Sequence, residues 1–498
     1  MRDGSIVIIG GGLGGLFTGA ILAKEGFKVT IVEKNATLGG GLQNFSRFGT
    51  SFDTGMHVIG GMQPGGNIRR ICEYLGIADK ASVMDVDKEC SDSLYFREDR
   101  RWYNIAKGKE GFVESLAAYF PQERNALRNY VRDLYAIVNE VDLFQLKPSF
   151  DSLTVHSDAF TQYADEFISS YFEDRRLRAV VAYMNPLYGG RGHQTPAYVH
   201  AIISVLYIEG TCRFVGGSSR FADLLADKIV QNGGRLVKGD AVSHVKVENR
   251  HITDVETSKG LSFKADTYIS DIHPCALLRI LSPGALPKAY CGRLDSIPNS
   301  YSAFSLYIKM KKGAFPYINH SEYCMGKYED IWKFGRTDKP WPMGFLFMTP
   351  PEDNQAVSAQ KVLVTSPMSF EQVRQWEHTT VGRRGDDYER WKEQRTQELL
   401  SQIDEMHPDF SYCIEAINAS SPLTIRDFYG SKEGGISGFS KDARNLALSQ
   451  IPVFTKIDNL FLTGQNVNLH GFCGVALTAI TTCEAILGRN YVLNKLKG

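Results

Sequence analysis

The sequence predicts an α/β protein with a discontinuous dinucleotide-binding domain and a second domain that carries an antiparallel sheet. Three observations predict this class. A strand–glycine–helix–strand unit opens the chain at residues 6–40, related segments return at residues 214–273 and 459–487, and residues 300–370 contain alternating strands. Strand–helix units are typical of parallel sheets and alternating strands of antiparallel ones, so two different sheets are expected.

The opening unit has the order of a Rossmann-type βαβ motif. Residues 6–9 (IVII) form an apolar, β-branched run suited to a buried strand. Gly10, Gly12 and Gly15 then fit G-x-G-x-x-G. The first glycine permits a tight turn, the second lets the backbone approach a pyrophosphate, and the third lets helix and strand pack closely. The following helix is expected over residues 13–25.

A second strand, residues 28–32, ends at Glu33. A carboxylate at this place can accept hydrogen bonds from the ribose hydroxyls of an adenine dinucleotide, which favours FAD or NAD over NADP. A further glycine cluster follows at residues 39–41, and then the segment FGTSFDTGMHVIGG at residues 48–61. This pattern suits a backbone that runs close to a long, extended cofactor, so FAD is favoured over NAD.

These segments resemble a known family. The glycine fingerprint, the E-x(5)-GG spacing from Glu33 and the FDTG-x-H segment are similar to the FAD-dependent phytoene desaturase superfamily, and most closely to its retinol saturase branch. Many members of the superfamily carry GGR where this chain has GGG at residues 39–41. That departure removes one possible flavin or phosphate contact, and the retinol saturase branch also lacks the arginine.

The resemblance extends to the C-terminal segment. Residues 459–466 (NLFLTGQN) read as a buried strand ending in a glycine turn, and a helix is expected over residues 475–487. In the family this unit returns to the FAD, and the helix N-terminus points at the isoalloxazine. A helix N-terminus can stabilise negative charge on a reduced flavin. Asn466 stands where relatives often have an acid.

The middle of the chain resembles the family at residues 214–273, where relatives place the first valine of V-x-x-V, here Val242, against the adenine. Residues 422–438 resemble a family loop beside the flavin ring. The resemblance implies a GR2-like flavoprotein fold with non-covalently bound FAD. The expected FAD contacts, from the fingerprint and the resemblance together, are Gly10, Gly12, Leu13, Gly14, Gly15, Glu33, Lys34, Gly40, Gly41, Leu42, Thr54, Gly55, Met56, His57, Val242, Gly464, Gln465, Asn466, Gly471, Gly474, Val475 and Ala476.

The segments between these motifs predict the second domain. Residues 156–208 are helical and rich in aromatic residues, and the loop 185–193 is the candidate lining of a substrate pocket, although a plain helical core is the competing interpretation. The sheet at residues 300–370 would form the pocket floor. The expected divisions are 1–80, 211–280 and 421–498 for the FAD-binding domain, 81–210 for a helical cap and 281–420 for the antiparallel sheet.

Composition excludes several classes. The chain has 498 residues, 43% of them hydrophobic and 22% charged, with zero formal net charge, so a nucleic-acid surface is not expected. Nine cysteines without a C-x-x-C pair predict neither a disulfide framework nor a metal site. The first strand begins near residue 5 and no apolar stretch is long enough for a span, so neither a signal peptide nor a membrane span is expected. We expect a cytoplasmic protein, with peripheral membrane contact and oligomeric state left open.

The chemistry expected of such a chain belongs to its flavin. The resemblance implies hydride transfer from reduced flavin to a double bond of an apolar polyene or isoprenoid. No second G-x-G-x-x-G is present, so a separate nicotinamide domain is not expected. Either NAD(P)H visits the same face of the flavin as an external reductant, or electrons arrive from another carrier. His57, Tyr188 and His193 are the candidate catalytic residues, with His470 a further candidate.

Three alternatives stay open. The same scaffold could act as a desaturase or an isomerase. An amine oxidase-like enzyme is a second alternative, in which Cys473 could hold the flavin covalently. A non-catalytic FAD-binding protein is the third.

Overall fold

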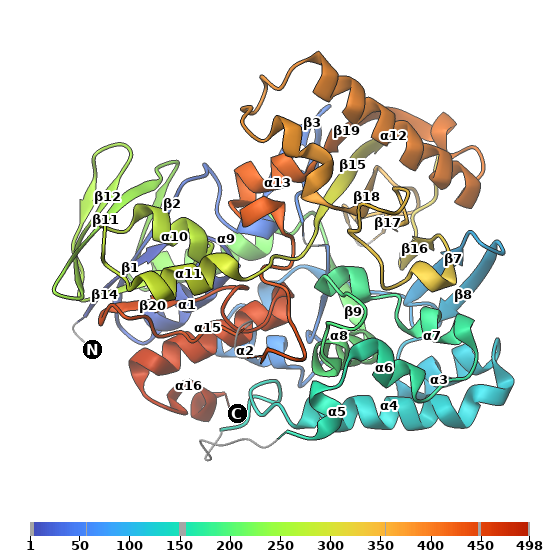
Figure 1. Ribbon diagram of the computed structural model, residues 1–498, viewed down its shortest axis with the longest axis horizontal. Coiled ribbons are helices and arrows are strands. Elements are labelled where there is room, and N and C mark those ends of the chain that lie inside the picture. Colours follow the sequence, from blue (N-terminus) through green and yellow to red (C-terminus); the bar gives the residue numbers. More distant parts are fainter. Residues whose placement is uncertain (1–3, 56, 149–155, 354, 447–449, 497–498) are drawn as a thin grey trace.

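The computed structural model describes residues 4–55, 57–148, 156–353, 355–446 and 450–496. Figure 1 shows a parallel-sheet half that contains both termini, and a second half in which a long sheet lies above a group of helices. Helices α8 (Ala197–Glu209) and α13 (Pro422–Tyr429) lie between these parts. The α/β class predicted from the sequence is confirmed.

The parallel sheet has the strand order β10-β2-β1-β14-β20, and every neighbouring pair in it is parallel. Its strands come from the start, middle and end of the chain, so the dinucleotide-binding part is discontinuous. The strands are β1 (Ser5–Ile9), β2 (Lys28–Glu33), β10 (Arg235–Lys238), β14 (Thr267–Ser270) and β20 (Leu460–Leu462). The helices packed in this part are α1 (Leu13–Lys24), α9 (Ser219–Gln231) and α15 (Gly471–Leu487).

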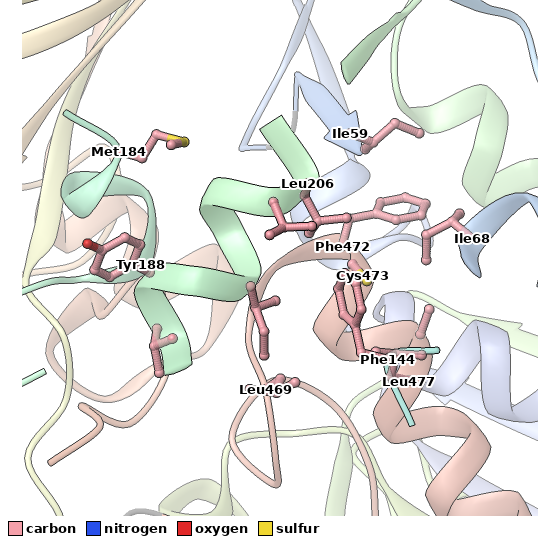
Figure 2. Packing of buried hydrophobic residues seen from close by; sticks show 14 of the residues in the cluster. Ile59, Ile68, Phe144, Met184, Tyr188, Leu206, Leu469, Phe472, Cys473 and Leu477 are labelled. Atoms are coloured by element: carbon pink, nitrogen blue, oxygen red, sulfur yellow. The ribbon is translucent and has the colours of Figure 1, made fainter. Parts of the chain in front are cut away.

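Helix α15 begins four residues earlier than the sequence predicts, because Gly471 rather than Val475 is its first residue. Nearly all of the buried residues of α15 are apolar, among them Phe472 and Ala476. Figure 2 shows Ile59, Ile68 and Leu206 gathered around Phe472. The start of α15 is therefore held by the hydrophobic core.

A seven-stranded sheet with the order β19-β15-β18-β17-β16-β7-β8 forms the second part. All its pairs are antiparallel except β16 with β7. Its strands are β7 (Asp92–Phe96), β8 (Arg101–Ile105), β15 (Ser302–Met310), β16 (Ser321–Met325), β17 (Gly344–Met348), β18 (Lys361–Met368) and β19 (Ile414–Ser420). The hairpin β7–β8, which the sequence analysis assigned to the helical cap, thus extends the sheet. The exact domain boundaries stay a prediction.

The cap contains several short helices and one long buried helix. Their bounds are α3 (Lys109–Ala117), α4 (Arg124–Asn139), α5 (Asp158–Thr161), α6 (Ala164–Ser169), α7 (Arg175–Val181) and α8 (Ala197–Glu209). Apolar residues at three-four spacing predict helix throughout residues 109–145. The structure breaks it at Pro121, which begins a single 3₁₀ turn, because proline cannot continue the hydrogen bonds of a preceding helix.

The remaining elements surround these parts. Helix α2 (Asn67–Leu75) ends before Gly76, which takes the left-handed conformation with φ 69°. The small sheets contain β3 (Asn44–Arg47) and β4 (Thr50–Asp53), β5 (Val58–Gly60) with β9 (Thr211–Phe214) and β6 (Val83–Asp85), and β11 (Val242–Glu248), β12 (His251–Thr257) and β13 (Ser262–Phe263). The other helices are α2 (Asn67–Leu75), α10 (Pro274–Ile280), α11 (Lys288–Ser296), α12 (Asp386–Met406), α13 (Pro422–Tyr429) and α16 (Tyr491–Lys495).

Candidate functional site

One large cavity, of about 1200 Å³, connects the parallel-sheet part to the second sheet and the cap. At one end it is lined by the glycine turns after β1, β2 and β20. At the other end it is lined by α8 and by the inner face of the seven-stranded sheet. A dinucleotide region and an apolar region therefore share one continuous space.

The structure brings most of the predicted cofactor residues to this cavity. Gly15 and Ala476 are not among the lining residues, and Met56 lies outside the described residues. Those that line the cavity are Gly10, Gly12, Leu13, Gly14, Glu33, Lys34, Gly40, Gly41, Leu42, Thr54, Gly55, His57, Val242, Gly464, Gln465, Asn466, Gly471, Gly474 and Val475.

The glycine turn is packed so closely that side chains would not fit. A Cβ on Gly14 would lie 2.8 Å from the Cα atom of Gly464 and would also collide with Asp271. A Cβ on Gly12 would lie 2.6 Å from Oδ2 of Asp271. The bare backbone leaves the first turn of α1 open to the cavity, and helix N-termini bind phosphate groups through their amides. The turn therefore fits the pyrophosphate of a dinucleotide.

Glu33 is anchored at the end of β2. The amide of Gly11 donates a hydrogen bond to Oε2 of Glu33, and the amide of Asn35 donates one to Oε1, each at 2.8 Å. Its side chain is almost wholly buried, and it lines the same end of the cavity as Val242. This position fits the ribose-binding carboxylate that the sequence predicted.

Asp271 is a site residue that the sequence analysis did not select. It follows β14 directly and lines the cavity beside the glycine turn. Burial raises the pKa of Asp271 to about 7, while hydrogen bonds from the Gly15 and Gly12 amides lower it and the Glu33 charge raises it further. Its place after a parallel strand next to β1 was the available signal, because ligands bind at the carboxyl ends of such strands.

Tyr429 is a second such residue. It ends α13, and its ring carbons lie 3.5 Å and 3.8 Å from the positions that a Cβ would take on Gly40 and Gly41. The 422–438 segment was expected beside the flavin through the family resemblance. The structure forms a helix there and brings an aromatic ring to the wall of the dinucleotide region.

His57 and His470 both line the cavity as neutral rings. Burial lowers the pKa of His57 to about 4; the Asp53 carboxylate opposes this shift, and the charges of Lys361 and Arg213 add to it. Burial and then the Lys441 charge lower the pKa of His470 to about 3. Within the described residues, Nδ1 of His57 and both ring nitrogens of His470 are buried without a hydrogen-bond partner. Both rings thus lie at the cavity wall with nitrogens that no described residue satisfies.

Tyr188 and His193 do not line the cavity. The Tyr188 hydroxyl pairs with Nδ1 of His200 at 3.0 Å in the core of the cap, on the opposite side of α8 from Phe472 (Figure 2). The His193 ring is 75% exposed and faces Asp165 and Glu166. The sequence placed both near the substrate because their loop contains helix breakers, but the loop packs its tyrosine inward and its histidine outward.

Three elements, α8, β16 and β17, form much of the apolar region of the cavity, and none of them brings a charged side chain to it. Helix α8 and strands β16 and β17 contribute apolar residues, a serine and two tyrosines. They are Val199, Ile202, Ile203, Leu206, Tyr207, Ser321, Tyr323, Met325, Gly344, Phe345, Leu346 and Met348. Such a lining suits an uncharged, mostly apolar ligand.

Two negative findings hold for the described residues. No group of three or more histidine, cysteine, aspartate or glutamate side chains is placed to hold a metal ion. Among the described helices, none combines the length and the apolar character that crossing a membrane requires.

Comparisons with known proteins agree with this geometry. Residues 8–75 match the family model of the NAD(P)-binding Rossmann-like domain. All-trans-retinol 13,14-reductase of Rattus norvegicus is 27% identical over 97% of this chain and 86% of its own length. Prolycopene isomerase 2 of an Oncidium hybrid is 22% identical over 92% of this chain and 79% of its own length. A 4,4′-diapophytoene desaturase of Methylomonas is 24% identical over 62% of this chain and 61% of its own length.

Solved structures share the fold. An oxidoreductase from Methanosarcina mazei superposes with a TM-score of 0.65 at 18% identity, covering 96% of this chain and 100% of its own. A putrescine oxidase superposes with a TM-score of 0.65 at 13% identity, covering 98% and 99%. These likenesses confirm the predicted fold, and the names of the curated relatives agree with the expected class of oxidoreductase. Over nearly its whole length, the chain is similar to the all-trans-retinol 13,14-reductases and, at lower identity, to prolycopene isomerases, and over 62% of its length it is similar to a diapophytoene desaturase.

Proposed function

We propose that this protein is an FAD-dependent oxidoreductase that saturates a carbon–carbon double bond of an apolar polyene or isoprenoid. The observation that carries the proposal is one continuous cavity, in which the glycine turns lead to a region where α8, β16 and β17 bring no charged side chain. The names of the retinol reductases and carotenoid enzymes support the substrate class.

The cofactor is proposed to bind without a covalent link. Cys473 lines the cavity, but burial raises the pKa of its thiol to about 12. The thiolate is the nucleophilic form of cysteine, so a thiol that stays protonated is a poor group for attachment. Since the sequence holds only one G-x-G-x-x-G, an NAD(P)H reductant would have to enter the same cavity.

Some of the lining residues would bind the cofactor, and others would exclude water or move a proton. The glycine turns and Glu33 would hold the dinucleotide, and the flavin, when bound, would supply hydride equivalents. Leu206 and Phe472 keep water from the apolar region. We propose His57 as the group that moves a proton at Nδ1, because the residue lines the cavity and that atom has no hydrogen-bond partner among the described residues. Tyr188 and His193 have no such access and are withdrawn from this role.

A desaturase or isomerase on the same cavity is the second candidate, favoured by the relatives that carry those names. An amine oxidase-like reaction is less well supported, because α8, β16 and β17 bring no carboxylate to the apolar region to pair with a substrate ammonium. A non-catalytic FAD-binding protein would not need the apolar region at all.

Because an apolar substrate partitions into membranes, we also propose transient peripheral contact with a membrane surface.

Product analysis tests the proposal. Protein reduced anaerobically is mixed with a conjugated polyene, and the extracted product is identified by chromatography and mass spectrometry. A product that has gained H₂ supports saturation. A product of unchanged mass supports the isomerase candidate, and loss of H₂ with oxidised protein supports the desaturase. An unchanged polyene in all conditions would contradict the proposed function.

A further inference from the structure

Two tyrosines and one serine are the polar residues that α8, β16 and β17 bring to the apolar region of the cavity. Tyr207 lies near the C-terminal end of α8, and Tyr323 lies in the middle of β16. Both line the cavity, so a helix and a facing sheet each bring a phenol to the same space. The Tyr323 ring is 2% exposed.

The hydroxyl of Tyr323 is buried and has no hydrogen-bond partner among the described residues. The Tyr207 phenol lies near Tyr323 and helps to raise its pKa, through its charge and through side-chain hydrogen bonding, but no contact of ordinary hydrogen-bond geometry reaches the Tyr323 hydroxyl from the described residues. A buried donor without a partner is costly, and native proteins satisfy nearly all such groups. A ligand atom that accepts a hydrogen bond would satisfy this one.

The groups behind Tyr323 hold it in place. Its ring packs edge-on against Tyr183, with the ring centroids 4.9 Å apart. The Tyr183 hydroxyl donates a hydrogen bond of 3.0 Å to Oδ2 of Asp92. Asp92 of β7 pairs with Ser321 of β16. Ser321 lies two residues before Tyr323, so Asp92 and Tyr323 are on the same face of the sheet. The phenol is therefore fixed by packing and not by a polar partner.

The subsite is uncharged at neutral pH. Burial raises the pKa of Tyr323 well above its usual value, so the phenol keeps its proton and can donate. Burial likewise raises the pKa of Asp92 to about 8, with the Arg213 charge opposing, so that carboxyl is largely neutral. The guanidinium of Arg213 does not line the cavity, and its Nη1 donates to the carbonyls of Ile318 and Thr349 at 2.9 Å each.

We propose that Tyr207 and Tyr323 form a subsite that binds a neutral oxygen, a hydroxyl or a carbonyl, at one end of the apolar substrate. Such an oxygen can accept from both phenols when it lies between them. An ammonium or carboxylate end would meet no opposite charge from α8, β16 or β17. The proposal rests on the proposed function, and it adds that the substrate carries one polar end and enters the cavity in one orientation.

The test compares three polyenes of the same skeleton, an alcohol, the corresponding aldehyde and the corresponding hydrocarbon. Their dissociation constants are measured on flavin-loaded protein by fluorescence quenching. The wild-type protein should bind the alcohol and aldehyde about tenfold more tightly than the hydrocarbon, the value of one hydrogen bond. Tyr323→Phe and Tyr207→Phe should each remove most of that difference and leave hydrocarbon binding unchanged.

Tyr188→Phe is the matched control, because this buried tyrosine lies in the same part of the chain but does not line the cavity. It should leave all three constants unchanged. Equal binding of the three ligands by the wild type, or equal weakening of all three by Tyr323→Phe, would overturn the subsite and leave the proposed function standing. If no polyene binds at all, the proposed function fails as well. Should Tyr323→Phe fail to fold, Tyr207→Phe gives the same comparison.

Discussion

At the scale of single residues, Asp271 is the most informative position. Its carboxyl receives hydrogen bonds from the Gly12 and Gly15 amides at the first turn of α1, where a pyrophosphate would bind. A negative charge at this place repels phosphate, and a neutral carboxyl does not. Since burial raises the pKa of Asp271 to about 7, its charge changes within the pH range of ordinary binding experiments.

The affinity for FAD should therefore fall as the pH rises through about 7. Asp271 is protonated below this value and ionised above it, so the repulsion is added on the alkaline side. Calorimetric or spectroscopic FAD titrations at pH about 6 and about 8 should differ several-fold for the wild type. Asp271→Asn, which cannot ionise, should show nearly the same constant at both. A wild-type constant that is flat across this range would contradict the assignment.

The glycine turn gives a second prediction at this scale. Gly14→Ala places a methyl group 2.8 Å from the Gly464 Cα and against Asp271, and backbone atoms cannot move aside without opening the site. FAD affinity should fall by about a hundredfold or more. Gly292→Ala in α11 is the control, because nothing lies within 4 Å of its Cβ position. Undiminished FAD binding by the Gly14 variant would show that the turn does not contact the cofactor.

At the scale of secondary-structure elements, α8 separates two environments. Leu206 and Tyr207 on one side line the cavity, while His200 on the other joins Tyr130 and Tyr188 in the core of the cap. Tyr188 thus ties the loop 185–193 to α8. Periodicity alone does not reveal which side of a mostly apolar helix faces a ligand. The sequence therefore could not show that Tyr207 lines the cavity while His200, with its partner Tyr188, does not.

Tyr188→Phe should accordingly affect stability and not chemistry. It removes one hydrogen bond to His200 and should lower the free energy of unfolding by about 1 kcal/mol. Denaturant unfolding measures this change, and the flavin spectrum and the turnover number should remain those of the wild type. A large loss of turnover in a variant of normal stability would return Tyr188 to the catalytic residues.

At the scale of the whole molecule, the parallel sheet was predictable and the second sheet only partly so. The motifs around Gly10, Gly216 and Gly464 are local, so the sequence reports them directly. The pairing of β7 with β16 joins residues more than two hundred positions apart, and no local pattern encodes it. The same long-range register brings Asp92 and Tyr323 to one face, which explains why the sequence analysis did not find that subsite.

Buried histidines give a prediction for the whole fold. Burial lowers the pKa of His57 to about 4 and those of His200 and His470 to about 3, so all three are neutral in the folded state. In the unfolded chain they titrate near 6.5. The stability that they contribute is complete above that value and is lost as the pH falls below it, because the unfolded state then binds more protons.

The raised pKa values of Asp92 and Asp271 act in the opposite direction, since these carboxyls are protonated in the fold. Their contribution is present at low pH and is lost as the pH rises toward 7 and 8. The histidines are more numerous, so the free energy of unfolding of flavin-free protein should decrease from pH about 6.5 to about 5. His193→Gln, at an exposed ring, should leave the profile unchanged. Rising stability on acidification over this range would contradict the assignment of neutral buried histidines.

The central claim is that one cavity holds a flavin beside an apolar substrate, and an anaerobic spectrum tests it most directly. Purified protein, supplied with FAD if needed, is reduced with NADH, NADPH or dithionite, and a polyene is then added. We predict the absorption of oxidised flavin, its loss on reduction, and its return when the polyene accepts the hydride. A protein that shows no flavin absorption even after FAD is supplied would contradict the account.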